Sequence, residues 1–583
     1  MKLRCSLFRV ARTVTAGLAF VWLGRTAPEV VFQPSATRVP CFDFLEVTLN
    51  ISGSTAANPF TDVTVTGTFT PPGGTPIAVD GFCDSLDGSV QRIRFMPSKP
   101  GPHPYTVSYR EGGFERTYQG SFEAVDSKRK GVVRVDPEFP WHFQWDGSKE
   151  RFFWNGTTTY WLAGWDDASI REILDRLDRL KVTRVRAALS GRVKDGRAWF
   201  ENVFPTEKFS FLLNPWVARA PLSVEQPDFD TTRFNVDFWQ KYERLLRHAW
   251  TKDMVVSVVF YVDGNRPGVD PFGKAGMGGP EEQRYYRYAI ARLAPFANVM
   301  WDLANEYRHF RDDAWAEKMG PFVKQCDPYD HLTSTHGHGD FRFRTSPWAD
   351  FAMYQSWDEH GGYGFMLHNR QQQADTGRRM PQVNEEYGYE DHYPQGWGEN
   401  RVAPARSAEN RRRLAWEICL AGGYQTTGER ADRGTGWGPD TGGGWLNGRG
   451  DDEMTMLELY GHLYDFFTSI TWWTLQPEPG LVSSFVPTSK AARNPSPALA
   501  ARNPAGDLAV VYLPEGGVVT LKGDLLKDGL KPMWFSPRDG GIRVARALRT
   551  KVYRTPDNHD WVLLFRTPCN CSFREYDDEL EQR

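Results

Sequence analysis

The sequence predicts a multidomain α/β protein with a central (β/α)8 TIM barrel flanked by N-terminal and C-terminal β-sandwich domains. From about residue 140 to 475, strand-like and helix-like segments alternate, as they do in βαβ units of a parallel sheet. Before and after that stretch, short segments of alternating apolar and polar residues are separated by Pro/Gly turns. The length of 583 residues suits one large barrel with two smaller companions.

Changes in these patterns suggest the domain boundaries. "FLEVTLNIS" and "DVTVTGTFTPPGG" are typical of a small sandwich, and "DLAVVYLP" and "DWVLLFR" return to strand character near the C-terminus. We expect a signal-like leader and extension over 1–37, an immunoglobulin-like β-sandwich over 38–127, the catalytic barrel over 128–482 and a C-terminal β-sandwich over 483–583.

Eight strand candidates, most of them followed by a helix, support the barrel. The first, "FFWNGTTTYWLAGW", precedes the amphipathic helix "DDASIREILDRLDRLK", and the third, "MVVSVVFYVDGN", reads as fully buried. The eight candidates cover 152–165, 182–191, 254–265, 298–305, 331–340, 350–357, 380–391 and 421–429. In such a barrel the active site lies at the C-terminal ends of the strands.

The composition excludes several classes of partner. The chain is 40% hydrophobic and 25% charged with a net charge of −3, so nothing suggests nucleic acid or a membrane surface as its target. Seven scattered cysteines form neither a disulfide framework nor a zinc motif.

The N-terminus has the order of a secretory signal. Four basic residues among the first twelve precede an apolar stretch over 14–23, which is too short to span a bilayer. Arg25 sits where a small residue is wanted, so the cleavage site is unclear. We expect a secreted or periplasmic protein without a membrane span.

Two carboxylates end strands of the expected barrel. The apolar strand in "NVMWDLANEYRHF" finishes in Asn305-Glu306, and "PQVNEEYGYE" places Glu386 at the end of the seventh strand. A buried carboxylate is costly unless it is paired or used. Two of them converging on one mouth suit glycoside hydrolysis, in which one protonates the leaving oxygen and the other attacks the anomeric carbon.

The ordered set of motifs resembles a known family. "FFWNGTTTYWLAGWDD", "VNEEYGYED" and "AGGYQTTGE" are similar to apiosidase-like (β/α)8 barrels of the clan A glycoside hydrolases. The stretch from "NPFTDVTVTGTFTPPGG" to "GPHPYTV" resembles the immunoglobulin-like domain that precedes such barrels, and "WFSPRDGG" resembles their collagen-binding-type C-terminal sandwich. The resemblance covers nearly the whole chain after residue 38.

The resemblance implies a retaining hydrolase of plant or algal poly- or oligosaccharides. Glu306 matches the general acid/base, Glu386 the nucleophile and Asn305 the residue that binds the sugar 2-hydroxyl. Arg186 matches an Arg that keeps the nucleophile ionised and oriented. The remaining expected substrate-binding residues are His336 on the acid/base side, Tyr354 as a hydrogen-bond donor to the nucleophile, Glu429, and the sugar-stacking candidates Trp165, Trp357 and Trp437.

Several alternatives stay open. Glu385 lies beside Glu386, and because neighbours on a strand face opposite ways, only one is expected to reach the mouth; the Glu-aromatic-Gly pattern favours Glu386. A non-catalytic carbohydrate-binding or adhesion protein is the second hypothesis. A metal-dependent hydrolase built on His336 and His338 is the third. The favoured mechanism needs no metal or organic cofactor. The sugar, exo or endo action and the charge of the substrate are not defined by the sequence.

Overall fold

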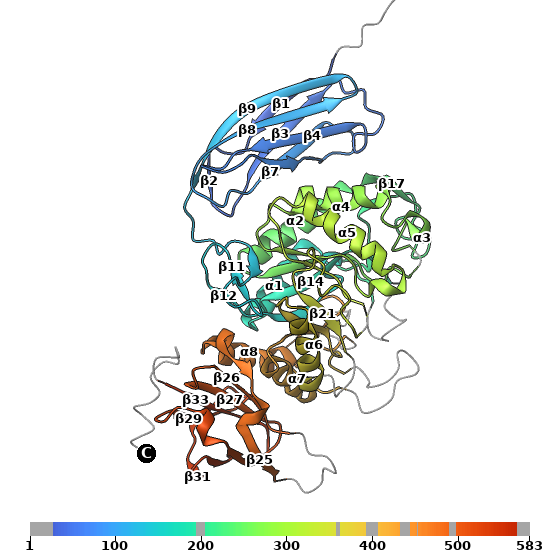
Figure 1. Ribbon diagram of the computed structural model, residues 1–583. Helices are drawn as coiled ribbons and strands as arrows, with labels where there is room; N and C mark the ends of the chain where they lie inside the picture. Colours follow the sequence, from blue (N-terminus) through green and yellow to red (C-terminus); the bar gives the residue numbers. More distant parts are fainter. Residues whose placement is uncertain are drawn as a thin grey trace, which may run out of the picture.

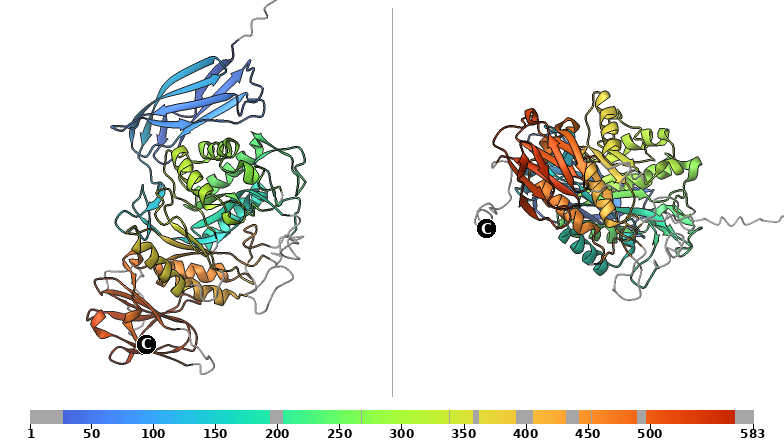
Figure 2. Two further views of the ribbon diagram at one scale, coloured as in Figure 1. Left: turned by 45° about the vertical axis from the view of Figure 1, so that its right-hand side comes forward. Right: turned by 90° about the horizontal axis from the view of Figure 1, so that it is seen from below.

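The computed structural model describes residues 27–193, 204–266, 268–337, 339–356, 362–391, 406–431, 443–451, 453–488 and 497–567. Three regions are stacked end to end, with an N-terminal pair of sheets, a central barrel and a C-terminal pair of sheets (Figures 1 and 2). This confirms the predicted fold class. Of the expected leader and extension over 1–37, residues 1–26 lie outside the described residues, whereas Glu29–Pro34 form strand β1 of the N-terminal region. Within them, no helix combines the length and apolar character that crossing a membrane requires.

The N-terminal region packs two antiparallel sheets face to face. Strand β3 alternates buried and more exposed residues, as expected when one face covers a core. One sheet has the order β1 (Glu29–Pro34), β3 (Leu45–Ser52), β7 (Val90–Phe95), β6 (Phe82–Cys83). The other has the order β2 (Arg38–Pro40), β9 (Phe114–Val125), β8 (Gly101–Glu111), β4 (Val63–Phe69), β5 (Ile77–Asp80).

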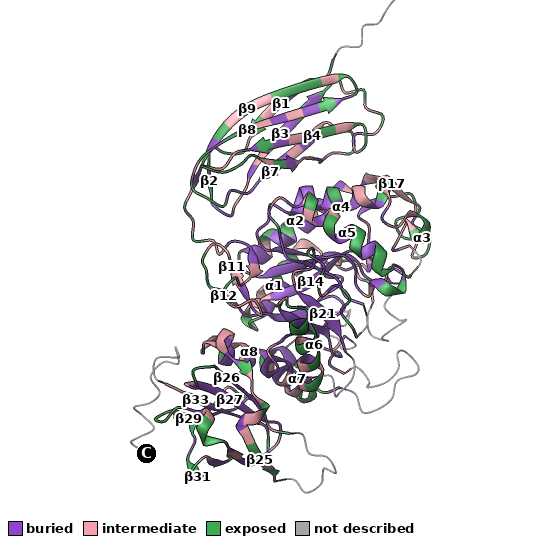
Figure 3. Cartoon of the chain, in the orientation of Figure 1, coloured by how far each residue is buried: buried purple, intermediate pink, exposed green. Residues whose placement is uncertain are grey.

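Eight parallel strands form the barrel in chain order. They are β13 (Asn155–Thr158), β14 (Arg184–Arg192), β18 (Val255–Tyr261), β19 (Val299–Asp302), β20 (Thr333–Ser334), β21 (Ala352–Gln355), β22 (Gln382–Glu386) and β23 (Tyr424–Thr427). Ladders join all neighbours except β20 and β21, where the Asp350 amide donates to the Thr333 carbonyl at 3.0 Å and the Ser334 hydroxyl to the Phe351 carbonyl at 2.7 Å. Every residue of β14 and β18 is buried (Figure 3), as covered parallel sheets require.

Helices cover the outside of the barrel. They are α1 (Asp167–Arg179), α2 (Val236–Trp250), α4 (Pro280–Leu293), α5 (Asp313–Cys326), α6 (Tyr363–Asp375), α7 (Ala408–Leu420) and α8 (Met456–Thr468), with a short α3 (Gly273–Gly276) in a loop. Side-chain N-caps fix three of their starts: Asp166, Asp312 and Ser407 each accept from a backbone amide three residues on. Smaller strands lie outside the ladder: β10 (Val133–Val135), β11 (Phe143–Trp145), β12 (Arg151–Phe152), β15 (Leu212–Leu213), β16 (Trp216–Ala218) and β17 (Phe229–Phe234).

The C-terminal region again pairs two antiparallel sheets. One has the order β24 (Gln476–Pro477), β26 (Leu499–Arg502), β27 (Leu508–Leu513), β33 (Trp561–Arg566), β29 (Lys531–Phe535), β30 (Ile542–Val544). The other has the order β25 (Val482–Pro487), β28 (Gly517–Leu521), β32 (Val552–Arg554), β31 (Ala547–Arg549). Arg412 on α7 holds this region to the barrel through two hydrogen bonds to the buried Asp560, at 2.8 and 3.1 Å.

Candidate active site

The carboxyl ends of the barrel strands bring the predicted polar residues together. Glu386 is the last residue of β22, and its Oε1 accepts from Arg186 Nη1 at 3.1 Å and from the Tyr160 hydroxyl. Its Oε2 accepts from Gln355 Nε2 at 2.9 Å. Donors on, or directly after, three other strands therefore fix both oxygens of one carboxylate.

Glu306 lies four residues beyond the end of β19, opposite Glu386. Its Oε1 accepts from the same Gln355 Nε2, at 2.6 Å. Because hydrogen bonds of 2.6 and 2.9 Å meet at one nitrogen, the two carboxylate oxygens are no more than 5.5 Å apart. Glu306 has a left-handed backbone, with φ 47° and ψ 46°, which costs energy in a residue with a Cβ. The left-handed backbone thus occurs at the residue whose side chain turns toward the second carboxylate.

The surroundings of Glu306 favour its protonated form. Burial raises the pKa of Glu306 to about 8; the charges of Glu386 and Asp263 raise it too, whereas the Gln355 hydrogen bond and Arg186 act in the other direction. The Glu306 side chain keeps 20% exposure, so the mouth is open to it, and His309 Nε2 lies 3.7 Å from its Oε2. Glu306 is therefore a carboxylic acid near neutral pH, within reach of solvent.

Arg186 is the cation around which this site is arranged. The residue is fully buried on β14, and its Nη2 donates to Asn305 Oδ1 at 2.8 Å. The same nitrogen lies 3.4 Å from Asp302 Oδ2 and 3.5 Å from His336 Nδ1. Neighbouring anions raise the pKa of Arg186 against the effect of burial, so the guanidinium stays charged. The structure thus brings Asn305, Arg186 and His336 to one cluster with Glu386.

The adjacent Glu385 occupies a separate position. A bulge in the pairing of β22 with β21 makes Glu385 the extra residue, so the strict alternation expected from the sequence does not hold. Glu385 accepts two hydrogen bonds from Arg184, at 2.5 and 2.8 Å, whereas Glu386 meets Arg186 two residues further along β14. Both glutamates therefore contact the same face of β14, at positions two residues apart. The side chains of Glu385 and Arg184 are completely buried.

Tyr354 does not donate to the predicted nucleophile. Its hydroxyl donates to Gln382 at 2.5 Å and accepts from Arg344 at 2.9 Å. The next residue on β21, Gln355, makes the hydrogen bond that was expected of Tyr354, because consecutive strand residues point to opposite faces. The strand was predicted correctly, but the residue was off by one.

Two further candidates are used in packing. Glu429 is buried in a two-pronged ion pair with Arg176 of α1, both bonds being 2.8 Å long. The indole of Trp165 is also buried; its Nε1 donates to the Asn447 carbonyl at 3.0 Å, and its ring lies 4.6 Å from that of Phe209. Neither side chain is free to meet a sugar in this structure. Trp357 and Trp437 lie outside the described residues.

Tyr160 and Gln355 were not among the residues predicted from the sequence. Both follow the rule that strand ends carry the chemistry, since Tyr160 comes two residues after β13 and Gln355 ends β21. Their residue types gave no signal in the sequence. Tyr160 lies in a segment rich in aromatic residues, and Gln355 is an amide between Tyr354 and Trp357, which were predicted site residues. Asp263 and Asp302 were missed as well, and burial raises the pKa of each to about 6.

The described residues contain no cluster of three or more His, Cys, Asp or Glu side chains placed to hold a metal ion. The metal-dependent hypothesis also depended on His338, which lies outside the described residues, and its partner His336 lies against the cation Arg186.

Comparisons with known proteins agree with this architecture. Residues 145–428 match the family model described as "Apiosidase-like, catalytic domain". Residues 38–110 match a domain of unknown function, DUF5060, so the immunoglobulin-like assignment stays a prediction. Residues 486–566 match the "Putative collagen-binding domain of a collagenase". None of the curated proteins matches the chain.

Several solved structures share the fold. A "putative glycoside hydrolase" from Bacteroides vulgatus ATCC 8482 aligns with a TM-score of 0.68 and 20% identity, over 91% of this chain and 100% of that one. A glycoside hydrolase family 5 structure from the same organism has a TM-score of 0.57 and 14% identity, over 75% of this chain and 94% of that one. A third, described as "Glycoside hydrolase", has a TM-score of 0.56 and 15% identity, over 75% and 97%.

Proposed function

We propose that this chain, which carries an apiosidase-like glycoside hydrolase domain over residues 145–428, cleaves glycosidic bonds with retention of anomeric configuration. The observation that carries the proposal is the single amide of Gln355 between Glu306 and Glu386. It holds one oxygen of each carboxyl group within 5.5 Å of the other, which supports the roughly 5–5.5 Å spacing of a retaining pair over the roughly 6.5–9.5 Å that an inverting pair uses to admit a water.

The two glutamates divide the chemistry according to their surroundings. Glu386, held by Arg186 and Tyr160, attacks the anomeric carbon, while Glu306 gives its proton to the leaving glycosidic oxygen. In the second step Glu306 takes a proton from water, the water oxygen attacks the anomeric carbon, and the bond to Glu386 breaks. One water molecule is consumed for each glycosidic bond that is cleaved.

Asn305 binds the sugar next to the nucleophile in this proposal. Arg186 and Tyr160 both contact its Oδ1 at 2.8 Å, which turns the amide donors of Asn305 toward a sugar hydroxyl. A hydrogen bond to the 2-hydroxyl that strengthens in the transition state contributes to catalysis. His336 supports this arrangement through Arg186.

The substrate is proposed to be a plant or algal poly- or oligosaccharide, reached outside the cytoplasm after export. The test is a digest of a polysaccharide panel by wild type, Glu306→Gln and Glu386→Gln, followed by chromatography of the released sugars. We expect products from wild type that vanish in both variants.

Products that persist in a variant would remove that glutamate from its proposed role. Retention of wild type on a polysaccharide gel without release of sugar would favour the binding-protein hypothesis instead. Retention of configuration is tested separately by the anomer that first appears in proton NMR spectra.

A further inference from the structure

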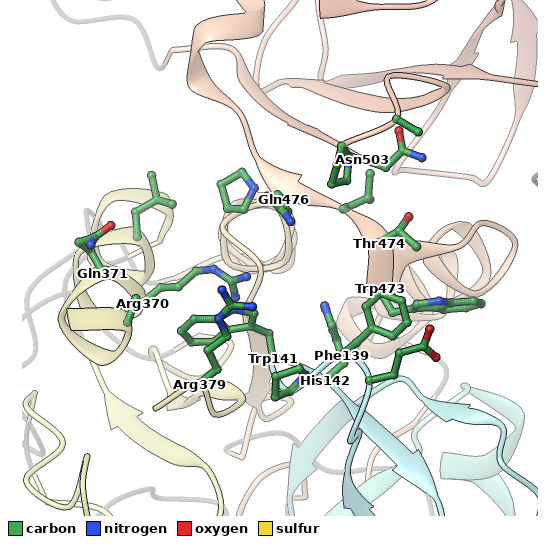
Figure 4. Close-up of a pocket in the computed structure, with 18 residues that line it drawn as sticks. Phe139, Trp141, His142, Arg370, Gln371, Arg379, Trp473, Thr474, Gln476 and Asn503 are labelled. Carbon is green, nitrogen blue, oxygen red and sulfur yellow. The ribbon is translucent and has the colours of Figure 1, made fainter. Parts of the chain in front are cut away.

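A cleft of about 610 Å³ lies between the barrel and the C-terminal sheets, at the end of the barrel away from the two glutamates. Helix α6, the loop between β10 and β11, and the segment around β24 form its walls (Figure 4). Arg379, one of the lining residues, comes three residues before β22, whose far end carries Glu386. The cleft therefore opens at the N-terminal face of the barrel and is separate from the candidate active site.

Two arginines give this cleft an uncompensated positive charge. Arg370 and Arg379 line it, and neither forms an ion pair with any residue that the structure describes. Arg370 instead donates to the Gly422 carbonyl at 3.1 Å and lies 3.9 Å above the ring centre of Trp141. The one carboxylate among the described lining residues, Glu138, is engaged by Arg151 at 2.8 Å.

The electrostatic surroundings of this cleft favour an anion. Burial and, to a smaller extent, the charge of Arg379 lower the pKa of Arg370 to about 10, so the group remains a cation at neutral pH. Burial and the charges of Arg370 and Arg151 lower the pKa of His142 to about 3, so this lining imidazole is neutral. A carboxylate that enters the cleft would meet the guanidinium groups of Arg370 and Arg379, whereas Glu138 is already paired with Arg151.

Aromatic rings and amides complete the lining. Figure 4 shows Trp473 on the opposite side of the cleft from the arginines, beside Phe139, with Gln476 and Asn503 above. Trp473 is half-buried, so part of its apolar face is accessible to a sugar ring. Side-chain amides supply both donors and acceptors, the combination that hydroxyl groups require.

Trp473 also lines a second cleft of about 570 Å³ on the same face of the barrel. That cleft includes Trp145, Phe153 and Arg151, and the guanidinium of Arg151 lies 5.0 Å from the ring centre of Trp473. A ligand longer than one sugar can therefore cross Trp473 and contact both clefts. This favours an oligosaccharide over a single small anion.

We propose that this cleft is a non-catalytic binding site for an acidic saccharide, with a uronate carboxylate between Arg370 and Arg379 and a sugar ring on Trp473. The proposal goes beyond the hydrolytic function and does not depend on it. Such a site would hold an anionic polysaccharide against the protein while another segment occupies the catalytic mouth.

The test is isothermal titration of the full-length chain carrying Glu386→Gln with trisaccharides of galacturonic, guluronic and mannuronic acid, and with neutral maltotriose. In that background, Arg379→Gln should weaken binding of an acidic trisaccharide about tenfold, the value of one charge-assisted hydrogen bond. Arg379→Lys should restore part of the affinity. The matched control is Arg549→Gln, an exposed arginine of β31, which should leave the affinity unchanged.

A second variant tests the sugar rather than its charge. Trp473→Ala should weaken the acidic trisaccharide and leave acetate, titrated as a simple carboxylate, unaffected. The proposal is overturned if no acidic trisaccharide binds, or if Arg379→Gln leaves the affinity unchanged. It is also overturned if acetate binds as tightly as the trisaccharide, because the cleft would then be a general anion site.

Discussion

Two buried networks of arginines and carboxylates in this molecule shift the pKa values of carboxyl groups in opposite directions. Where the N-terminal sheets meet the barrel, Arg94 and Arg292 surround Glu243, and Arg292 also pairs with Asp84 at 2.5 Å. Although burial alone would raise the pKa values of Asp84 and Glu243, the arginines lower both. At the barrel mouth, the pKa of Glu306 is instead raised to about 8.

The ratio of cations to anions explains the difference. At the junction, three arginines (Arg92, Arg94 and Arg292) converge on three carboxylates (Glu46, Asp84 and Glu243), so each negative charge is compensated. At the mouth, Arg186 contacts Glu386 and Asp302, whereas Glu306 accepts an amide hydrogen bond from Gln355 and lies 3.7 Å from His309 Nε2. Complete charge pairing at the junction stabilises the contact between the N-terminal sheets and the barrel. Incomplete pairing at the mouth leaves Glu306 protonated, so that it can act as an acid.

The largest effect is expected from Glu386→Gln. Loss of the nucleophile should lower kcat by about 10⁴-fold or more, with little change in the thermal unfolding midpoint. The matched control is Glu243→Gln at the junction, which should reduce stability and leave kcat of the folded protein unchanged. Activity assays and calorimetry on both variants measure the contrast; comparable kcat losses in the two would show that the networks are not functionally distinct.

Arg292→Met should be the most destabilising single change at the junction. It removes one of the two arginines that pair with each of Asp84 and Glu243, and breaking a buried ion pair costs about 3–5 kcal/mol. Urea unfolding followed by tryptophan fluorescence measures the loss. A midpoint equal to that of wild type would mean that the junction does not contribute to stability as described.

Gln355→Ala should lower kcat by about 10²-fold, the typical effect of removing one preorganised donor from a reacting centre. Its neighbour supplies the control, because Tyr354→Phe removes a hydroxyl that contacts Gln382 and Arg344 instead. We expect near-normal kcat for Tyr354→Phe. If the two variants lose activity equally, the shared amide has no special role.

The smallest effect concerns stability against pH. Between its ordinary pKa of 4.5 and about 8, Glu306 keeps a proton in the folded protein that the unfolded chain releases. Wild-type stability therefore falls as pH rises through this window. Glu306→Gln avoids the cost and should be more stable on the alkaline side, by on the order of 2 kcal/mol. An advantage that is the same at pH 4.5 and pH 8 would contradict the raised pKa.

The fold could be predicted because its signals are local. Alternating apolar residues, helix periods and capping aspartates such as Asp166 and Asp312 each specify their own segment, and eight such strands in order leave few topologies. The convergence of Glu306 and Glu386 followed from the barrel itself, since parallel strands bring their ends to one mouth, whereas Asn305 and Arg186 were expected from the family resemblance.

The wrong predictions lie where a shift of one residue in strand pairing changes which side chain reaches the site. The bulge at Glu385 and the exchange of Tyr354 for Gln355 depend on how β21 and β22 pair, which no single segment encodes. Glu429 was misjudged for another reason. Its partner, Arg176, lies on a helix some 250 residues earlier in the sequence, where it has the appearance of an ordinary surface arginine.

The protonation state of Glu306 tests the central claim most directly. Infrared difference spectra of wild type against Glu306→Gln, recorded across a pH series on the full-length protein, isolate the signal of this one carboxyl group. We predict the C=O band of a protonated acid at neutral pH, replaced by carboxylate bands as the pH passes about 8. Carboxylate bands already present at about pH 6 would contradict the claim that Glu306 stays protonated because too few cations surround the carboxylates at the barrel mouth.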